Sequence, residues 1–145
     1  MTRHPALVPL SHDHHHALVE ARRLRRAADD PEADPGPAAA AFAEFFATAT
    51  VPHFREEEET LFPLVVDSEE ARPVLVEVLL DHLRLHALAA RLERASDVRA
   101  AMRELGELLD AHVRREEREL FPLIERVAAA ELEGGAPPPT GPRSR

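Results

Sequence analysis

The stretch HFREEEETLFPL, residues 53–64, recurs later in the chain as HVRREERELFPL, residues 112–123. Eight of the twelve aligned positions are identical, and both copies keep a His followed four residues later by a Glu. Residues four apart lie on the same face of an α-helix, one turn above each other. Two such helices facing each other would therefore direct two imidazoles and two carboxylates at one interior point.

Two further segments are rich in His. Residues 81–86 (DHLRLH) place two imidazoles four apart, and residues 11–18 (SHDHHHAL) carry a cluster near the start of another helix. The two segments match weakly at an offset of 68, which aligns Asp13 with Asp81 and His14 with His82. We therefore predict four helices that carry His at matching depth, arranged as two related helical hairpins.

The composition favours a single all-α domain. The 145 residues are enough for one core, and the chain is rich in Ala, Leu, Glu and Arg, with no Tyr or Trp. Helices are expected over about 11–28, 38–64, 72–95 and 97–132, with kinks at Pro52 and Pro122. Short connections predict an up-down-up-down four-helix bundle over residues 1–132, followed by a disordered Pro/Gly-rich tail over 133–145.

Composition also excludes several classes of partner and chemistry. The absence of Cys removes disulfides, thiolate catalysis, iron–sulfur clusters and Cys-based zinc sites. A formal net charge of −9 argues against a nucleic-acid partner. No apolar run approaches the ~20 residues of a membrane span and no leader opens the chain, so we expect a cytoplasmic protein without a membrane partner. A monomer or weak homo-oligomer is expected, and the sequence identifies no redox partner.

Helical phase and the internal repeat select among neighbouring polar residues. In the first helix, His14 lies at the edge of the apolar stripe, and His15 is the alternative. In the second, Glu57 is favoured over Glu56, because Glu57 recurs as Glu116.

Three other Glu residues, Glu58, Glu59 and Glu119, lie in the two repeated segments. Glu119 faces the apolar side of the fourth helix and is predicted to be a spare ligand or a hydrogen-bonding group beside one. It is also the only inward group that we can nominate as a proton donor. Glu58 and Glu59 are expected on a solvated face.

The inward set comprises five imidazoles and two carboxylates: His14, His53, Glu57, His82, His86, His112 and Glu116. A buried carboxylate without a partner is costly or becomes protonated, so this interior favours a metal site. The donors exceed the needs of one ion. Divided over two ions with both Glu bridging, they leave an open coordination position, which suits iron, with Mn or Zn less favoured.

With this order and spacing of ligands, the chain resembles the hemerythrin-like family, also called the HHE cation-binding domain. The resemblance covers about residues 7–130. It implies that His82, His86 and His112 hold one non-haem iron and that His14 and His53 hold the other. Glu57 and Glu116 would bridge the two ions together with a solvent-derived oxo or hydroxo group.

One departure from the family pattern bears on function. Oxygen-carrying hemerythrins use an Asp five residues after the fourth-helix His, whereas this chain has Glu116 at +4 and Glu117 at +5. Our first hypothesis is that the centre binds O₂ or NO at an open iron position. The alternatives are a di-iron enzyme that decomposes hydrogen peroxide or reduces O₂ or NO, and a non-redox module for iron storage or sensing.

Overall fold

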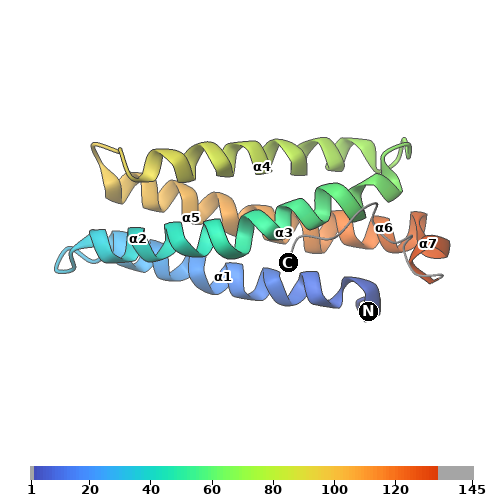
Figure 1. Cartoon of the computed structure of the whole chain (residues 1–145), viewed down its shortest axis with the longest axis horizontal. Coiled ribbons are helices and arrows are strands. Elements are labelled where there is room, and N and C mark those ends of the chain that lie inside the picture. Colours follow the sequence, from blue (N-terminus) through green and yellow to red (C-terminus); the bar gives the residue numbers. More distant parts are fainter. Residues whose placement is uncertain (1, 134–145) are drawn as a thin grey trace.

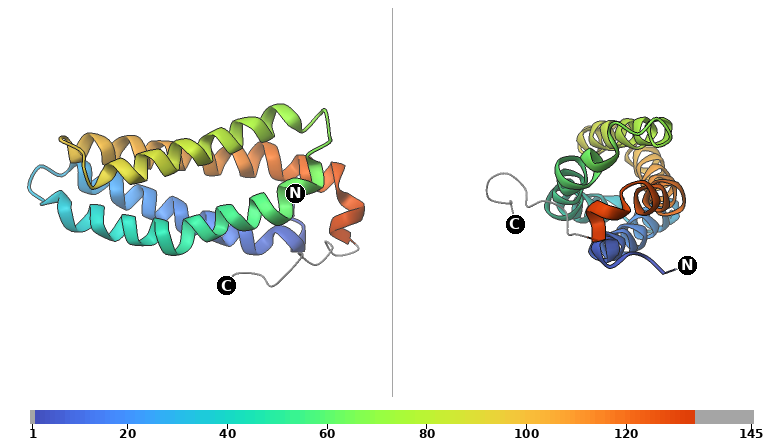
Figure 2. Two further views of the ribbon diagram at one scale, coloured as in Figure 1. Left: turned by 45° about the horizontal axis from the view of Figure 1, so that its top comes forward. Right: turned by 90° about the vertical axis from the view of Figure 1, so that its right-hand side faces the viewer.

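A computed structural model describes residues 2–133 of the chain and shows an all-α bundle (Figure 1). Its α-helical segments are α1 (Val8–Asp29), α2 (Pro35–Phe45), α3 (Val51–Glu56), α4 (Arg72–Leu92), α5 (Val98–Arg115), α6 (Phe121–Val127) and α7 (Ala129–Glu133). α2 continues into α3 and α5 into α6, so the segments form four long antiparallel rods, as predicted (Figures 1 and 2).

Helix boundaries follow local capping chemistry. Asp34 caps α2 by accepting a hydrogen bond from the Gly36 amide at 3.0 Å, and Asp97 caps α5 through the Ala100 amide at 3.0 Å. α5 begins at Val98, next to the start predicted at 97, whereas the start predicted at 11 is wrong, because α1 already begins at Val8. Glu133 closes α7, and the rest of the predicted tail lies outside the described residues.

Three prolines are accommodated by π-helical turns. The turns Phe46–Thr50, Glu57–Leu61 and Glu116–Leu120 each end immediately before an X-Pro pair, at Pro52, Pro63 and Pro122. A proline ring clashes with the carbonyl four residues earlier in a regular α-helix. The wider turn, in which an amide bonds to the carbonyl five residues back, lets the helix continue past Pro52 and Pro122, whereas Pro63 lies in a closing 3-10 turn, Phe62–Val65. The rod formed by α2 and α3 bends gently (Figure 1).

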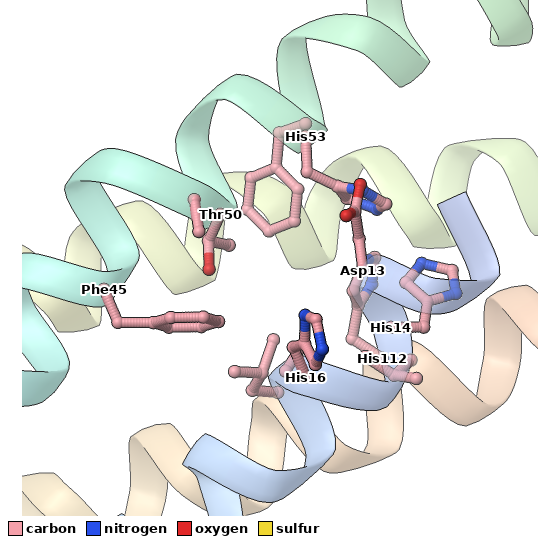
Figure 3. Close-up of a pocket in the computed structure, with 12 residues that line it drawn as sticks. Asp13, His14, His16, Phe45, Thr50, His53 and His112 are labelled. Atoms are coloured by element: carbon pink, nitrogen blue, oxygen red, sulfur yellow. The ribbon is translucent and has the colours of Figure 1, made fainter. Parts of the chain in front are cut away.

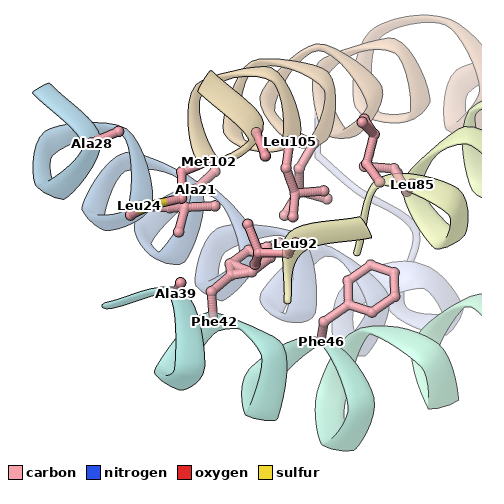
Figure 4. Close-up of a cluster of buried hydrophobic side chains, with 14 of the residues drawn as sticks. Ala21, Leu24, Ala28, Ala39, Phe42, Phe46, Leu85, Leu92, Met102 and Leu105 are labelled. Atoms are coloured by element: carbon pink, nitrogen blue, oxygen red, sulfur yellow. The ribbon is translucent and has the colours of Figure 1, made fainter. Parts of the chain in front are cut away.

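Two apolar clusters fill the bundle. One lies towards the end that holds the α1–α2 and α4–α5 connections and includes Leu24, Phe42, Leu92, Met102 and Leu105 (Figure 4). The other gathers residues from both chain ends and the rod connections: Leu7, Leu10, Phe62, Val65, Leu75, Phe121 and Ile124. Burying each large apolar side chain stabilises the fold by about 1.5–3 kcal/mol. Among residues 2–133, no helix is both long and apolar enough to cross a membrane.

α1 and α5 pack closely where a glycine faces α1. A Cβ at Gly106 would lie 2.7 Å from Arg25 Cγ and 3.0 Å from the Ala21 carbonyl oxygen. Arg25 then reaches past it to Asp110 at 3.1 Å. This close approach helps to fix the depth at which His residues on α1 and α5 enter the interior.

Candidate metal centre

Six polar side chains from all four rods meet between the two apolar clusters. They are His14 on α1, His53 and Glu57 on the second rod, His82 on α4, and His112 and Glu116 on the fourth rod. Each is at most 8% exposed, and both Glu are 0% exposed. Each rod thus carries its polar residues between side chains of one apolar cluster and side chains of the other. The structure brings together six of the seven predicted ligands.

The six residues form two groups that share both carboxylates. We call His14 and His53, with the two Glu, the first half of the centre, and His82 and His112, with the same Glu, the second half. Glu57 turns Oε2 towards His53 Nε2 at 3.0 Å and Oε1 towards His82 Nε2 at 3.3 Å.

Glu116 has the corresponding arrangement. Its Oε1 lies 2.8 Å from His14 Nε2, and its Oε2 lies 3.0 Å from His112 Nε2 and 3.4 Å from His82 Nε2. Each Glu therefore presents one oxygen to each half, which is the arrangement of a bridging carboxylate.

Eight atoms at the centre lack hydrogen-bond partners. They are the Nε2 atoms of the four His and the four carboxylate oxygens of Glu57 and Glu116. These atoms approach one another within 2.8–3.5 Å, but none of the contacts has acceptable hydrogen-bond geometry. Buried polar atoms are nearly always paired, so eight orphaned lone-pair donors directed at one point fit a metal site.

The electrostatics of the centre also fit a bound cation. Burial lowers the pKa of the His14 imidazole, but Glu116, Glu117 and Glu57 outweigh burial and raise that pKa to about 11. The pKa values of His53 and His82 rise to about 9 and about 10 for the same reason. In the metal-free protein, protons therefore occupy the position of a cation, and metal binding would displace them.

The opposite shift occurs at a shared carboxylate. Burial raises the pKa of Glu116, but the imidazoles of His112 and His14 hold it well below the usual value for Glu. The carboxylate that would bridge two cations is therefore kept charged by its surroundings.

Each imidazole is oriented by a second carboxylate at its other ring nitrogen. In the first half, His14 Nδ1 lies 2.6 Å from Glu117 Oε2 and His53 Nδ1 lies 2.9 Å from Asp13 Oδ2. In the second half, His82 Nδ1 lies 2.6 Å from Glu58 Oε2 and His112 Nδ1 lies 3.2 Å from Asp81 Oδ2. A proton held at Nδ1 leaves Nε2 free to bind metal, which is the usual way in which proteins orient ligating His.

These four carboxylates were not predicted as part of the site, although the repeat contains the signal. Glu58 aligns with Glu117 at the offset of 59, and Asp13 aligns with Asp81 at the offset of 68. Glu58 is exposed, as predicted, with 41% of its side chain accessible, but its carboxylate also contacts His82 Nδ1, which was not predicted. The two halves are thus related by an approximate twofold relation that includes ligands and orienting groups alike.

The π-helical turns keep the ligands in phase. In a regular α-helix, a step of four residues advances about 40° beyond a full turn, so a run of such steps leaves the interior face. The runs His53–Glu57–Leu61 and His112–Glu116–Leu120 nevertheless stay buried, because a π turn begins at each Glu. π turns occur frequently at functional sites.

Three predicted residues lie outside the centre. His86 is exposed and contacts only the rings of Phe46 and Phe54 among the aromatic side chains described, so its place in the inward set is wrong. The buried stripe of α4 runs from Val78 through His82 to Leu85 and Leu88, and His86 lies beside it, facing away from the interior. Glu119 is also exposed, which is wrong for an inward group, and His15 is exposed while His14 is buried.

A cavity of about 50 Å³ borders the first half of the centre (Figure 3). His14, His53 and His112 line it, together with apolar side chains such as Ala17 and Val113. Asp13 and His16, both exposed, lie on the α1 side of this space. The volume suits a diatomic molecule or a few waters.

The fold and the site together define a metal-binding helical bundle. The chain matches the Hemerythrin HHE cation binding domain over residues 7–134, and it belongs to this family. No curated protein matches the chain in sequence. No solved structure matches it either.

Proposed function

We propose that the centre holds two non-haem iron ions and binds O₂ or NO in the cavity beside its first half. The observation that carries the proposal is the pair of shared carboxylates, Glu57 and Glu116, each with one oxygen towards each pair of imidazoles. Two ions in these groups would each have two imidazole nitrogens and two carboxylate oxygens. Iron in sites of imidazole and carboxylate commonly takes five or six donors, so coordination positions remain open.

A reduced pair of irons, when bound, supplies the electrons and the vacant coordination position with which O₂ or NO is taken up. The residues of the chain contribute orientation and an apolar surrounding. Asp13 and Glu117 hold the imidazoles of the first half, and Ala17 and Val113 give the cavity an apolar wall. A small apolar space favours a diatomic ligand over hydrated ions.

The proposed alternative, an enzyme acting on hydrogen peroxide or reducing O₂ or NO, needs a proton donor at the open position. Glu119, the residue nominated for that role, is exposed and makes no contact with the centre in the described part of the chain. A binding role therefore has the better support. Storage or sensing of iron would need no cavity beside the ions.

The test is the metal content and visible spectrum of the purified protein. We expect about two irons per chain and a near-ultraviolet to visible band that bleaches with dithionite and returns in air. Sustained gas evolution from peroxide would favour the enzyme instead. Zinc, or less than one iron after reconstitution with ferrous ion, would contradict the proposal.

A further inference from the structure

Thr50 has a buried hydroxyl without a partner. Its side chain is 5% exposed, and its Oγ1 makes no hydrogen bond with any described residue. The nearby Thr48 shows the usual alternative: its hydroxyl donates to the Glu44 carbonyl four residues back at 2.8 Å. At Thr50, the corresponding carbonyl belongs to Phe46, and this carbonyl accepts the Val51 amide in the π turn.

The hydroxyl lies at the cavity beside the first half of the centre. Thr50 is one turn before His53 on the same rod, and both line the cavity. Figure 3 shows the Thr50 hydroxyl turned into the space between Phe45 and His16. The other lining residues of the second rod, including Ala49 and Phe54, are apolar. A lone hydroxyl in such a wall is costly unless something in the cavity accepts its proton.

In the other copy of the internal repeat, the position of Thr50 carries an apolar residue without a hydroxyl. At the offset of 59, Thr50 aligns with Leu109, an apolar core residue that is 1% exposed. Packing at this level of the rod is thus compatible with Leu in the other copy of the repeat. Packing of the rod therefore does not require a hydroxyl at this position.

We infer that Thr50 is a specificity-determining residue whose hydroxyl donates a hydrogen bond to a small ligand bound at the first half of the centre. The inference rests on the proposed function. The ligand class is a diatomic molecule or small anion whose atom away from the metal accepts a hydrogen bond. Ligands without a good acceptor at that atom gain nothing from Thr50, so the residue discriminates by chemistry rather than by size.

Azide is a suitable probe for the iron-loaded protein. Thr50→Val removes the hydroxyl and keeps the shape, Thr50→Ser keeps the hydroxyl, and Thr48→Val is the matched control on the same rod. Loss of one hydrogen bond to a charged ligand corresponds to about tenfold weaker binding or more. We expect Thr50→Val to bind azide at least about tenfold more weakly, and Thr50→Ser and Thr48→Val to bind it like the wild type.

A second readout separates a hydrogen bond from a change in packing. The asymmetric stretch of bound azide should shift on transfer to D₂O in the wild type and in Thr50→Ser, but not in Thr50→Val. Iron content is measured for every variant and should stay at the wild-type level. If the wild type binds azide and Thr50→Val matches it in affinity and in the D₂O shift, the inference is overturned while the proposed function stands. If the iron-loaded wild type binds no azide, both fail.

Discussion

Around His14 and His53 the bundle leaves a cavity, whereas the repeat places larger side chains at the corresponding positions around His82 and His112. Ala17 aligns with Leu85 at the offset of 68, and Leu85 is 0% exposed. At the offset of 59, Val113 aligns with Phe54, whose ring stacks on His82 with centroids 3.8 Å apart. The halves thus share ligands and orienting carboxylates but differ in their walls.

The repeated residues thus supply the buried His and Glu side chains of both halves, whereas small residues that do not recur in the repeat leave space for a ligand. A symmetric centre would offer two equivalent positions. In this bundle, the small side chain of Ala17 leaves space beside His14, whereas its counterpart Leu85 is a fully buried core residue.

The largest effect is expected from the carboxylates that both halves share. Glu57→Ala and Glu116→Ala should each lose most of both metal ions, because each Glu directs an oxygen at each half. Metal content per chain by mass spectrometry is the measurement, with circular dichroism to confirm the fold. Glu59→Ala, an exposed neighbour, is the control and should keep the full content. Two ions per chain in Glu57→Ala would show that the carboxylate is not shared.

The orienting carboxylates should have smaller, equal effects in the two halves. Glu117→Gln and Glu58→Gln each weaken the hold on one imidazole, His14 or His82. Loss of such a group typically lowers metal affinity about 10–100-fold. Competition with a chelator would measure the affinities. A loss of metal affinity in only one of the two variants would contradict the twofold relation. The Glu117 carboxylate also accepts hydrogen bonds from Arg3 and Ser11, which hold it in place.

The pH dependence of stability should have opposite signs without and with metal. The pKa values of His14, His53 and His82 are raised from 6.5 to about 11, 9 and 10 in the metal-free fold. Stability from a raised pKa is fully present below pH 6.5 and declines as pH rises towards the folded values. Each unit of difference corresponds to about 1.4 kcal/mol.

The metal-free protein should therefore melt at lower temperature at pH 9 than at pH 6. Metal binds the deprotonated imidazoles, so the stabilisation added by metal should grow over the same range. Thermal melts at several pH values, with and without ferrous ion under anaerobic conditions, measure both. A metal-free melting temperature that rises from pH 6 to pH 9 would contradict the raised pKa values.

Exchanging wall residues between the halves should affect ligand binding more than metal content. Ala17→Leu gives the first half the side chain of the second and should weaken azide binding about tenfold or more, with iron content unchanged, because it fills the cavity. The reverse exchange, Leu85→Ala, should lower the free energy of unfolding by about 2–5 kcal/mol through loss of buried packing. If Ala17→Leu bound azide as tightly as the wild type, azide would not bind in this cavity.

The smallest effect is expected at His86. Because it is exposed and outside both ligand groups, His86→Leu should keep the metal content of the wild type, whereas His82→Leu should not. The repeat already carries a Leu, Leu18, at the position aligned with His86. If His86→Leu lost one metal ion, His86 would be a ligand after all, as the family resemblance implies.

Six of the seven residues predicted to point inward do meet in the interior, and the sequence identifies them because helical spacing and an internal repeat act locally. His53 with Glu57, and His112 with Glu116, lie four apart on amphipathic helices, and the repeat selects the correct Glu from a run of four. The antiparallel bundle follows from the same pattern. The orienting carboxylates are also in the repeat, but their spacing does not show which imidazole each one contacts: Asp81 is buried, whereas Asp13 and Glu58 are exposed.

The tertiary structure alone decided how the rods turn about their axes. Whether His86 faces inward depends on the accumulated phase of α4, which is α-helical throughout, while π turns correct the phase at Glu57 and Glu116. Such turns arise from the fit of prolines and packing partners, which spacing does not encode. The cavity likewise exists only where Ala17, Thr50 and Val113 from three rods come together. Residue types and their helical spacing specify which side chains can bind a metal, whereas the packing of one rod against another places six of them together and leaves room for a ligand beside them.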